Sequence, residues 1–240
     1  MSQPSPPSST HTRALGAVGL LLALGGSSAA NGQQPGIEAA PAFKGRTVAG
    51  VMSYRGAPWL ERQEREAEEN SAALLEKMDL KRGQTVADLG CGSGFYSRRM
   101  ARLVGDEGTV FAVDIQPEML GILRQLSERE GIENIAPILA KEDDPHLPPG
   151  EIDWILLVDV YHELQRPAPV LAKLSEALAP NGRIALVEFR LDGDSAAHIK
   201  LDHRMSPQQV LKEWEPAGFE LVEQWEELPT QHLFIFKKRP

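Results

Sequence analysis

The chain has 240 residues, a formal net charge of −9, 42% hydrophobic residues and 25% charged residues. This length suits one α/β domain with an appendage and is too short for two full-sized domains. The acidic balance argues against a nucleic-acid partner, because binding to a phosphate backbone requires a basic face. The single cysteine, Cys91, excludes an internal disulfide.

The first 30 residues have the pattern of a secretory signal peptide. Arg13 precedes an apolar run over residues 14–26, and the small residues Ser28 and Ala30 suit a cleavage site. The run is too short to span a bilayer, which needs about 20 apolar residues. We therefore expect export, to the periplasm of a bacterium, and no stable membrane span after cleavage. A disordered tail on a cytoplasmic protein is the alternative.

Residues 31–58 are expected to form a linker and an N-terminal extension, and the folded domain is expected to span residues 59–240. The domain begins with highly charged helical segments over residues 59–69 and 71–78, supported by pairs one turn apart such as Glu61 and Arg65. A helix of this kind is usually a solvated face. The alternative is a helical lid over a site.

From residue 81 onward, expected strands and helices alternate, which predicts a parallel sheet with crossover helices. The last two strands are so close in the chain that they can pair only antiparallel. The fold class is therefore α/β: a mostly parallel, seven-stranded, Rossmann-like sheet with helices on both faces and a C-terminal antiparallel hairpin. The expected strands are residues 85–89, 109–113, 135–140, 153–158, 183–189, 219–225 and 232–237, and the expected helices are 95–103, 117–129, 168–178 and one that begins at Ser206.

A glycine-rich turn follows the first of these strands, with Asp88 ahead of Gly90, Gly92 and Gly94. A dinucleotide-binding turn requires its third glycine where this chain has Phe95. A carboxylate at Asp88 would also repel a pyrophosphate and favour a ligand that carries an ammonium group. S-adenosylmethionine (SAM) has an ammonium group and a sulfonium and lacks phosphate. The turn therefore favours SAM, and a nicotinamide-dependent oxidoreductase is the disfavoured alternative.

Asp114 ends the second strand, 20 residues past Gly94. An acid at this position can accept hydrogen bonds from both ribose hydroxyls of a nucleoside, and the following Ile115 could lie against the adenine face. Taken alone, Asp114 could equally be an acid at the start of the helix that Pro117 opens. Together with the glycine-rich turn, the ribose role is favoured.

The sequence Asp-Leu-Gly-Cys-Gly-Ser-Gly, followed by Val-Asp-Ile-Gln-Pro-Glu-Met-Leu, resembles the first two motifs of class I SAM-dependent methyltransferases. The resemblance covers residues 80–190 and is specific to that superfamily. An N-terminal Tyr-Arg-Gly-Ala-x-Trp-Leu-Glu-Arg element is similar to that of a bacterial subgroup that often carries a signal peptide and has no defined substrate. The resemblance implies SAM as the cofactor and a first set of binding residues: Asp88, Gly90, Cys91, Gly92, Gly94, Asp114 and Ile115.

The same resemblance implies an acid that binds the adenine amino group. Asp143 has the best spacing for this role, and Asp144 is the alternative. Asp159, or one of its neighbours after the fourth strand, would face the methionyl part of SAM.

Catalytic candidates lie after the fourth and fifth strands. Methyl transfer needs a base only when the acceptor must lose a proton. His162 is the best single candidate for that base, because its unperturbed pKa lies near neutrality. The plainer interpretation of residues 161–163 is a helix start that packs on the sheet. The catalytic candidates are Asp159, Tyr161 and His162, with Glu163, Glu188 and Arg190 nearby.

Other constellations carry less weight. His198, Asp202 and His203 lie in a polar insertion over residues 191–205, but a zinc site usually needs three or four convergent ligands, so we expect no metal. Cys91 is expected to be a small residue of the turn rather than a nucleophile. The sequence thus predicts methyl transfer to a small-molecule acceptor, and the alternative is a SAM-binding module without transfer activity. Acceptor specificity is expected in the N-terminal segment and the insertion, and the oligomeric state stays open.

Overall fold

The computed structural model describes residues 41–240, within one compact unit that runs from Ala39 to Pro240. The expected signal peptide and the first part of the linker lie outside the described residues. The described part of the expected N-terminal extension, residues 41–58, is hydrogen-bonded to the rest of the domain. The backbone N–H of Ala49, for example, donates to the carbonyl oxygen of His162 at 3.0 Å. Within residues 41–240, no helix has the length and apolar character needed to cross a bilayer.

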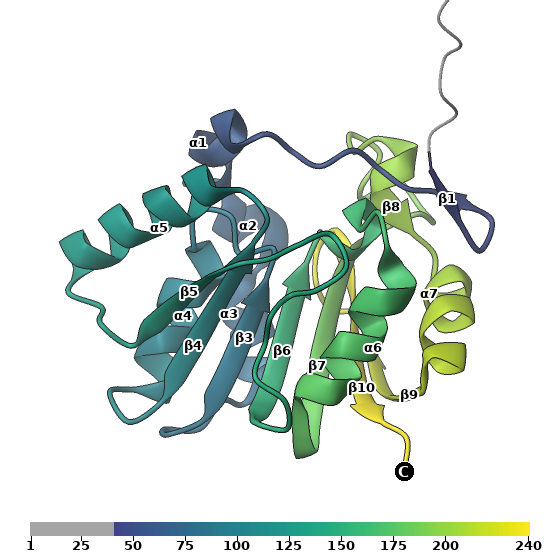
Figure 1. The fold of residues 1–240 in the computed structure, drawn as a ribbon. Coiled ribbons are helices and arrows are strands. Elements are labelled where there is room, and N and C mark those ends of the chain that lie inside the picture. The colour runs from purple at the N-terminus through teal and green to yellow at the C-terminus, as the bar shows by residue number, and fades with distance from the viewer. Residues whose placement is uncertain (1–40) are drawn as a thin grey trace, which may run out of the picture. The chain divides into compact units, whose positions relative to one another are not determined.

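The core of the unit is a sheet with the strand order β5-β4-β3-β6-β7-β10-β9 (Figure 1). The first five of these strands pair in parallel, and β10 pairs antiparallel with both β7 and β9. The predicted fold class is confirmed. An eighth strand that the sequence analysis missed, β8 (Arg204–Met205), pairs in parallel with the end of β7. The seven main strands are β3 (Thr85–Leu89), β4 (Thr109–Asp114), β5 (Ile135–Leu139), β6 (Ile152–Val158), β7 (Leu178–Arg190), β9 (Phe219–Trp225) and β10 (Gln231–Lys238).

Helices cover both faces of this sheet. Alternate residues of β3 point to opposite faces: Val86 packs in a cluster with α3 and α4, whereas Ala87 packs in another with α6 and α7. Because both faces are buried, the central strands are apolar almost throughout. The helices are α3 (Ser71–Met78), α4 (Phe95–Val104), α5 (Pro117–Glu130), α6 (Pro167–Ala177) and α7 (Pro207–Trp214). Three 3-10 turns lie between these elements: η2 (Tyr161–Glu163) after β6, η3 (Leu201–His203) before β8 and η4 (Glu215–Ala217) after α7.

The N-terminal segment crosses the edge of the sheet at which the parallel strands end (Figure 1). The expected helix over residues 59–69 is divided in two, and the solvated-face interpretation holds for one side of α2 only, where residues 66–68 are exposed. Arg65 is only 6% exposed and Glu69 only 1%, because α2 packs into the domain. The segment therefore covers this edge as a lid would. It consists of β1 (Ala42–Phe43), β2 (Arg46–Thr47), η1 (Tyr54–Gly56), α1 (Ala57–Leu60) and α2 (Arg65–Glu69).

Candidate functional site

A cavity of about 340 Å³ lies at the carboxyl ends of β3, β4 and β6, beneath the N-terminal segment. Ligands of open α/β sheets bind at this edge, and pockets for small ligands measure about 300 to 1,000 Å³. We distinguish two parts of the cavity. The glycine-loop half comprises Asp88, the turn over residues 90–94 and Asp114, and the histidine half comprises His162, Glu163 and His203.

The turn after β3 has backbone conformations that favour glycine. The φ angles of Gly90 and Gly92 are 71° and 54°. A Cβ on Gly90 would lie 2.5 Å from a methyl group of Val160, and a Cβ on Gly92 would lie 2.7 Å from Cδ1 of Leu60. Glycine is therefore required at both positions, for its conformation and for the space. The turn is held between the loop after β6 and the helix α1.

Asp114 fixes this turn from the end of β4. Its Oδ2 accepts from the backbone N–H of Gly92 at 2.9 Å, and its Oδ1 accepts from that of Gln116 at 2.8 Å. Burial raises the pKa of the carboxyl, and the backbone donors oppose that shift. Each carboxylate oxygen can accept more than one hydrogen bond. Asp114 can therefore hold the turn and still accept from the hydroxyls of a bound ligand.

Asp88 is buried at the end of β3, where it lines the cavity. Its Oδ2 accepts from the hydroxyl of Ser97 at 2.5 Å. Burial raises its pKa to about 6, against the opposing effects of the Ser97 hydrogen bond and of Arg65. A cation bound in the cavity would stabilise the ionised form of this carboxyl.

Asp159 follows β6 with a φ of 54°, a backbone conformation that is uncommon for a residue with a side chain. Its Oδ2 accepts from Nε2 of Gln231 at 2.7 Å, but its buried Oδ1 has no hydrogen-bond partner among the described residues. Burial raises the pKa of this carboxyl well above its ordinary value, and the neighbouring Glu69 and Glu188 raise it further. A buried acceptor left unpaired beside other acids suits a cationic ligand.

A buried ion pair in α2 forms another part of the site, and sequence reasoning missed it. Nε of Arg65 lies 3.0 and 2.9 Å from the two carboxylate oxygens of Glu69, and the hydroxyl of Tyr96 donates to Glu69 at 3.2 Å. The Arg65 guanidinium also lies 4.1 Å from the ring centroid of Phe95. Charged residues at helical spacing gave no sign of this burial, since the same pattern is typical of a solvated helix.

In the histidine half, His162 is 1% exposed and lines the cavity. Its Nδ1 lies 2.5 Å from Oε2 of Glu188, at the end of β7. Burial lowers the pKa of the imidazole, but the adjacent Glu188 carboxylate more than offsets it, so that the pKa is raised. The structure thus brings together two residues that the sequence placed after different strands.

Tyr161 points away from the cavity and into the core. It is fully buried, its ring centroid lies 5.2 Å from that of Trp214, and its hydroxyl donates to Glu213 at 2.8 Å. Burial and the Glu213 carboxylate both raise the pKa of the phenol. Of the alternatives left open for residues 161–163, packing on the sheet describes Tyr161, whereas His162 and Glu163 line the cavity. Tyr161 therefore has no part in the chemistry proposed below.

Of the remaining candidates, Ile115 and Cys91 line the cavity and Asp143 does not. Asp143 is not among the residues that line the cavity, and its carboxylate forms an ion pair with Arg166 at the surface. Ile115 is 41% exposed and does line the cavity. Cys91 also lines it, and burial raises the pKa of its thiol well above the ordinary value, which disfavours a reactive thiolate.

Comparison with known proteins was consistent with this geometry. A family described as a methyltransferase domain matches residues 80–231. The chain belongs to the methyltransferase domain family. The prediction of a SAM-dependent methyltransferase is thereby confirmed at the level of the family, with SAM as the cofactor. A curated relative, the ubiquinone/menaquinone biosynthesis C-methyltransferase UbiE of Erwinia tasmaniensis, is 31% identical over 111 residues, which is 46% of this chain and 44% of that protein. The chain thus spans less than half the length of the curated relatives it matches.

Solved structures show the same fold. A SAM-dependent methyltransferase from Aquifex aeolicus superposes with a TM-score of 0.71 and 24% sequence identity, covering 78% of this chain and 98% of that one. A TehB-like SAM-dependent methyltransferase from Corynebacterium glutamicum superposes with a TM-score of 0.58 and 17% identity, covering 77% of this chain and 98% of that one. At these identities, the likeness concerns the fold.

Proposed function

We propose that this chain transfers the methyl group of SAM to a small-molecule acceptor bound in the histidine half of the cavity. When bound, SAM supplies a methyl carbon activated by the adjacent sulfonium. The protein has to hold the acceptor atom in line with that carbon and keep water out. The N-terminal segment over the cavity supports the second task, because it covers the edge of the sheet where the ligand would lie.

The observation that carries the proposal is the charge of the cavity wall. Among its acidic, lysine and arginine residues, five are carboxylates and two are cations. This excess of acidic groups suits a cofactor that carries an ammonium and a sulfonium, because the positive charge of a bound ligand favours the ionised carboxylates. The unpaired Oδ1 of Asp159 would accept from the ammonium group, and Asp114 would accept from the ribose hydroxyls. The lining acids are Asp88, Asp114, Glu142, Asp159 and Glu163, and the cations are Arg65 and Lys141.

His162 supports the acceptor side of the reaction. The contact of its Nδ1 with Glu188 orients the ring and leaves Nε2 as the nitrogen that can meet a ligand in the cavity. An acceptor that must lose a proton would therefore bind beside Nε2. The histidine half contains this group, whereas the glycine-loop half, as defined above, contains no histidine.

The name of a curated relative suggests which class of acceptor to test first. The name of UbiE assigns that relative to C-methylation in ubiquinone and menaquinone biosynthesis. Oxygen-bearing aromatic rings are therefore the first acceptors to test with this chain. Apolar side chains such as Phe189, Ile199 and Leu164 also line the cavity, which is compatible with such a ring.

Calorimetric titration with SAM, followed by measurement of S-adenosylhomocysteine release over a panel of phenols and quinols, tests the proposal. We expect SAM to bind, NAD to leave the protein unaffected, and at least one acceptor to stimulate release. Absence of SAM binding would remove the proposed function. Binding of SAM without release on any acceptor would favour the alternative, a SAM-binding module without transfer activity.

Export is a separate proposal that rests on residues 1–30 alone. Their order of one arginine, an apolar run and small residues supports cleavage after Ala30. N-terminal sequencing of the protein from a periplasmic fraction should then begin at Asn31. An intact Met1 on the purified protein would contradict export by this route.

A further inference from the structure

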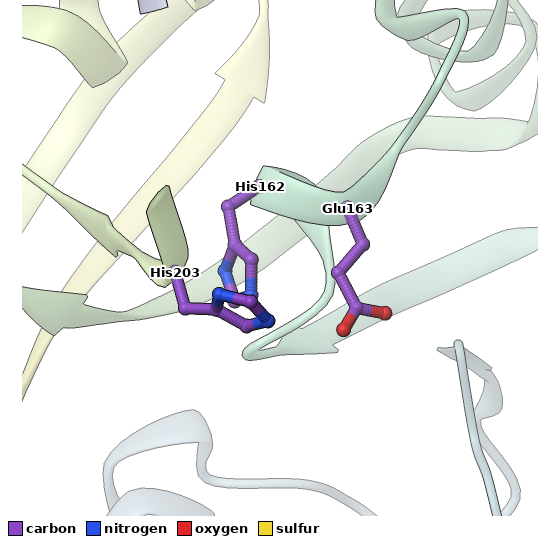
Figure 2. Close-up of side chains that lie close together, drawn as sticks. All are labelled: His162, Glu163 and His203. Carbon is purple, nitrogen blue, oxygen red and sulfur yellow. The ribbon is translucent and has the colours of Figure 1, made fainter. Parts of the chain in front are cut away.

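Three potential metal ligands meet in the histidine half. One ligand atom each from His162, Glu163 and His203 lie within 4.8 Å of one another, and the ring centroids of the two histidines are 5.1 Å apart. Figure 2 shows His162 and Glu163 on the same short turn, with the ring of His203 beside that of His162. All three residues line the cavity, so a bound ion could be reached by a ligand there.

Both imidazoles are oriented in the manner of metal-bound histidines. Nδ1 of His162 lies 2.5 Å from Oε2 of Glu188, and Nδ1 of His203 lies 2.9 Å from Oδ1 of Asp202. Histidines that bind metals almost always have their second ring nitrogen on a carboxylate, a backbone carbonyl or water, which fixes the tautomer and the ring. Each carboxylate contact here leaves Nε2 available to a metal. The orientation of both imidazoles therefore supports a metal site independently of the short distance between the ligand atoms.

The fold holds these ligands from distant parts of the chain. The carbonyl oxygen of His162 accepts from Nη1 of Arg46 at 2.9 Å and from the backbone of Ala49 at 3.0 Å, which fixes the turn η2. One oxygen of Glu163 accepts from the backbone N–H of Met52 at 3.3 Å. This contact uses Oε1 and leaves Oε2 for an ion. His203 is brought to the site by η3 and β8, which pairs with the end of β7 beside Glu188.

We propose that His162, Glu163 and His203 bind one divalent transition-metal ion of the zinc class in the cavity. Two imidazoles and one carboxylate are a ligand set of catalytic zinc sites and of non-haem iron sites, whereas magnesium and calcium prefer oxygen ligands. Three protein ligands leave at least one coordination position open. The use of that position rests on the proposed function: it would hold a hydroxyl, carboxylate or enolate oxygen of the methyl acceptor. With the ion bound, Nε2 of His162 is a ligand and not a base, and the ion instead favours loss of the proton from a coordinated hydroxyl.

The test uses the full chain with any polyhistidine tag removed and its metal stripped by a chelator. Titration with Co²⁺ should give a visible absorption band that saturates at one equivalent and is lost when Zn²⁺ is added. The variants Glu163→Gln and His203→Asn should each weaken Co²⁺ binding by at least about tenfold, and Glu188→Gln by about 10- to 100-fold. His198→Asn is the matched control, since this exposed histidine lies in the same insertion outside the cluster, and it should bind Co²⁺ as the parent does.

Circular dichroism of each variant checks that it is folded, and the nearly isosteric Glu163→Gln gives an answer even if His203→Asn does not fold. No Co²⁺ or Zn²⁺ binding by the folded parent, or equal binding by parent and Glu163→Gln, would overturn the proposal. Titration of the metal-free protein with SAM separates the two proposals. SAM binding without metal binding would remove the metal site alone, and metal binding without SAM binding would remove the proposed function alone.

Discussion

The glycine-loop half of the cavity is formed by residues close together in sequence, whereas the histidine half is assembled from segments far apart. Asp88 lies near the end of β3, the glycines follow it directly in the turn, and Asp114 ends the adjacent strand. His162 and His203, by contrast, are oriented by Glu188, Asp202 and Arg46. The first half depends on backbone conformation and the second on buried side-chain pairs. Substitutions should therefore damage the two halves in different ways.

The largest effect is expected in the histidine half, from Arg46→Met. Nε of Arg46 lies 2.9 Å from Oε1 of Glu213, which is fully buried. Removing one partner of a buried ion pair costs about 3–5 kcal/mol, because the other charge is left uncompensated. Urea unfolding measures this loss. The double variant Arg46→Met/Glu213→Gln should recover part of it, and an unchanged double variant would mean that the charge is not the cause.

In the glycine-loop half, Gly94→Ala should destabilise the folded protein through a strained backbone conformation and a steric clash. Its φ is 85°, and a Cβ would lie 1.9 Å from Cδ1 of the buried Leu123. A left-handed residue with a side chain costs about 1–2 kcal/mol and overpacking about 1–3 kcal/mol, so we expect a loss of about 2–5 kcal/mol in the free energy of unfolding. Gly121→Ala is the matched control. Gly121 lies in α5 with open space around it, and alanine there should stabilise the protein by up to about 1 kcal/mol.

Asp88, in the glycine-loop half, should make the free energy of unfolding of the protein depend on pH. Burial raises its pKa from 3.8 to about 6 in the folded protein. The folded state therefore binds the proton more tightly than the unfolded state, and the free energy of unfolding should fall by about 2 kcal/mol as the pH rises from about 4 to about 6. Urea unfolding of the parent and of Asp88→Asn across this range isolates the contribution. Parallel pH profiles for the two proteins would show that Asp88 does not contribute it.

Asp159→Asn tests the boundary between the two halves. It keeps the shape of the side chain but removes the charge that would meet the ammonium of SAM, so the affinity for SAM should fall about 10- to 100-fold, or about 1.4–2.7 kcal/mol. The melting temperature should not fall, because a buried carboxyl beside Glu69 and Glu188 is removed. The control is Asp143→Asn, at the residue that the family resemblance assigns to adenine. Since Asp143 lies outside the cavity lining, this variant should bind SAM as the parent does, and a comparable loss would restore the adenine role.

The same contrast explains what the sequence could predict. The order of strands and the glycine turn depend on local patterns, such as the apolar run of β6 and the glycines at 90 and 92, and both were predicted closely. Arg65 looked like a residue of a solvated helix, because nothing in its charge pattern indicates the Phe95 and Tyr96 rings that it packs against. Burial of this kind results from tertiary packing, which sequence spacing does not encode.

The histidines illustrate the same limit from the opposite direction. His203 was grouped with its sequence neighbours His198 and Asp202, and nothing in the spacing of these three residues indicates that their side chains converge. In the structure, the short β8 brings His203 beside His162, which lies 41 positions earlier in the chain. A two-residue strand has no periodicity from which to predict it. Of the two sequence neighbours, Asp202 does contact His203 in the structure, through its carboxylate and Nδ1 of the imidazole.

The N-terminal segment that crosses the carboxyl edge of the sheet lies outside the family match but forms part of the cavity wall. The family match begins at residue 80, yet Met52, Leu60 and Arg65 form part of the cavity wall. A shortened protein that starts at residue 80 would keep every glycine of the turn and all three potential metal ligands, but one side of its binding chamber would be open to water. The region that the family match covers is thus smaller than the region that encloses the cavity.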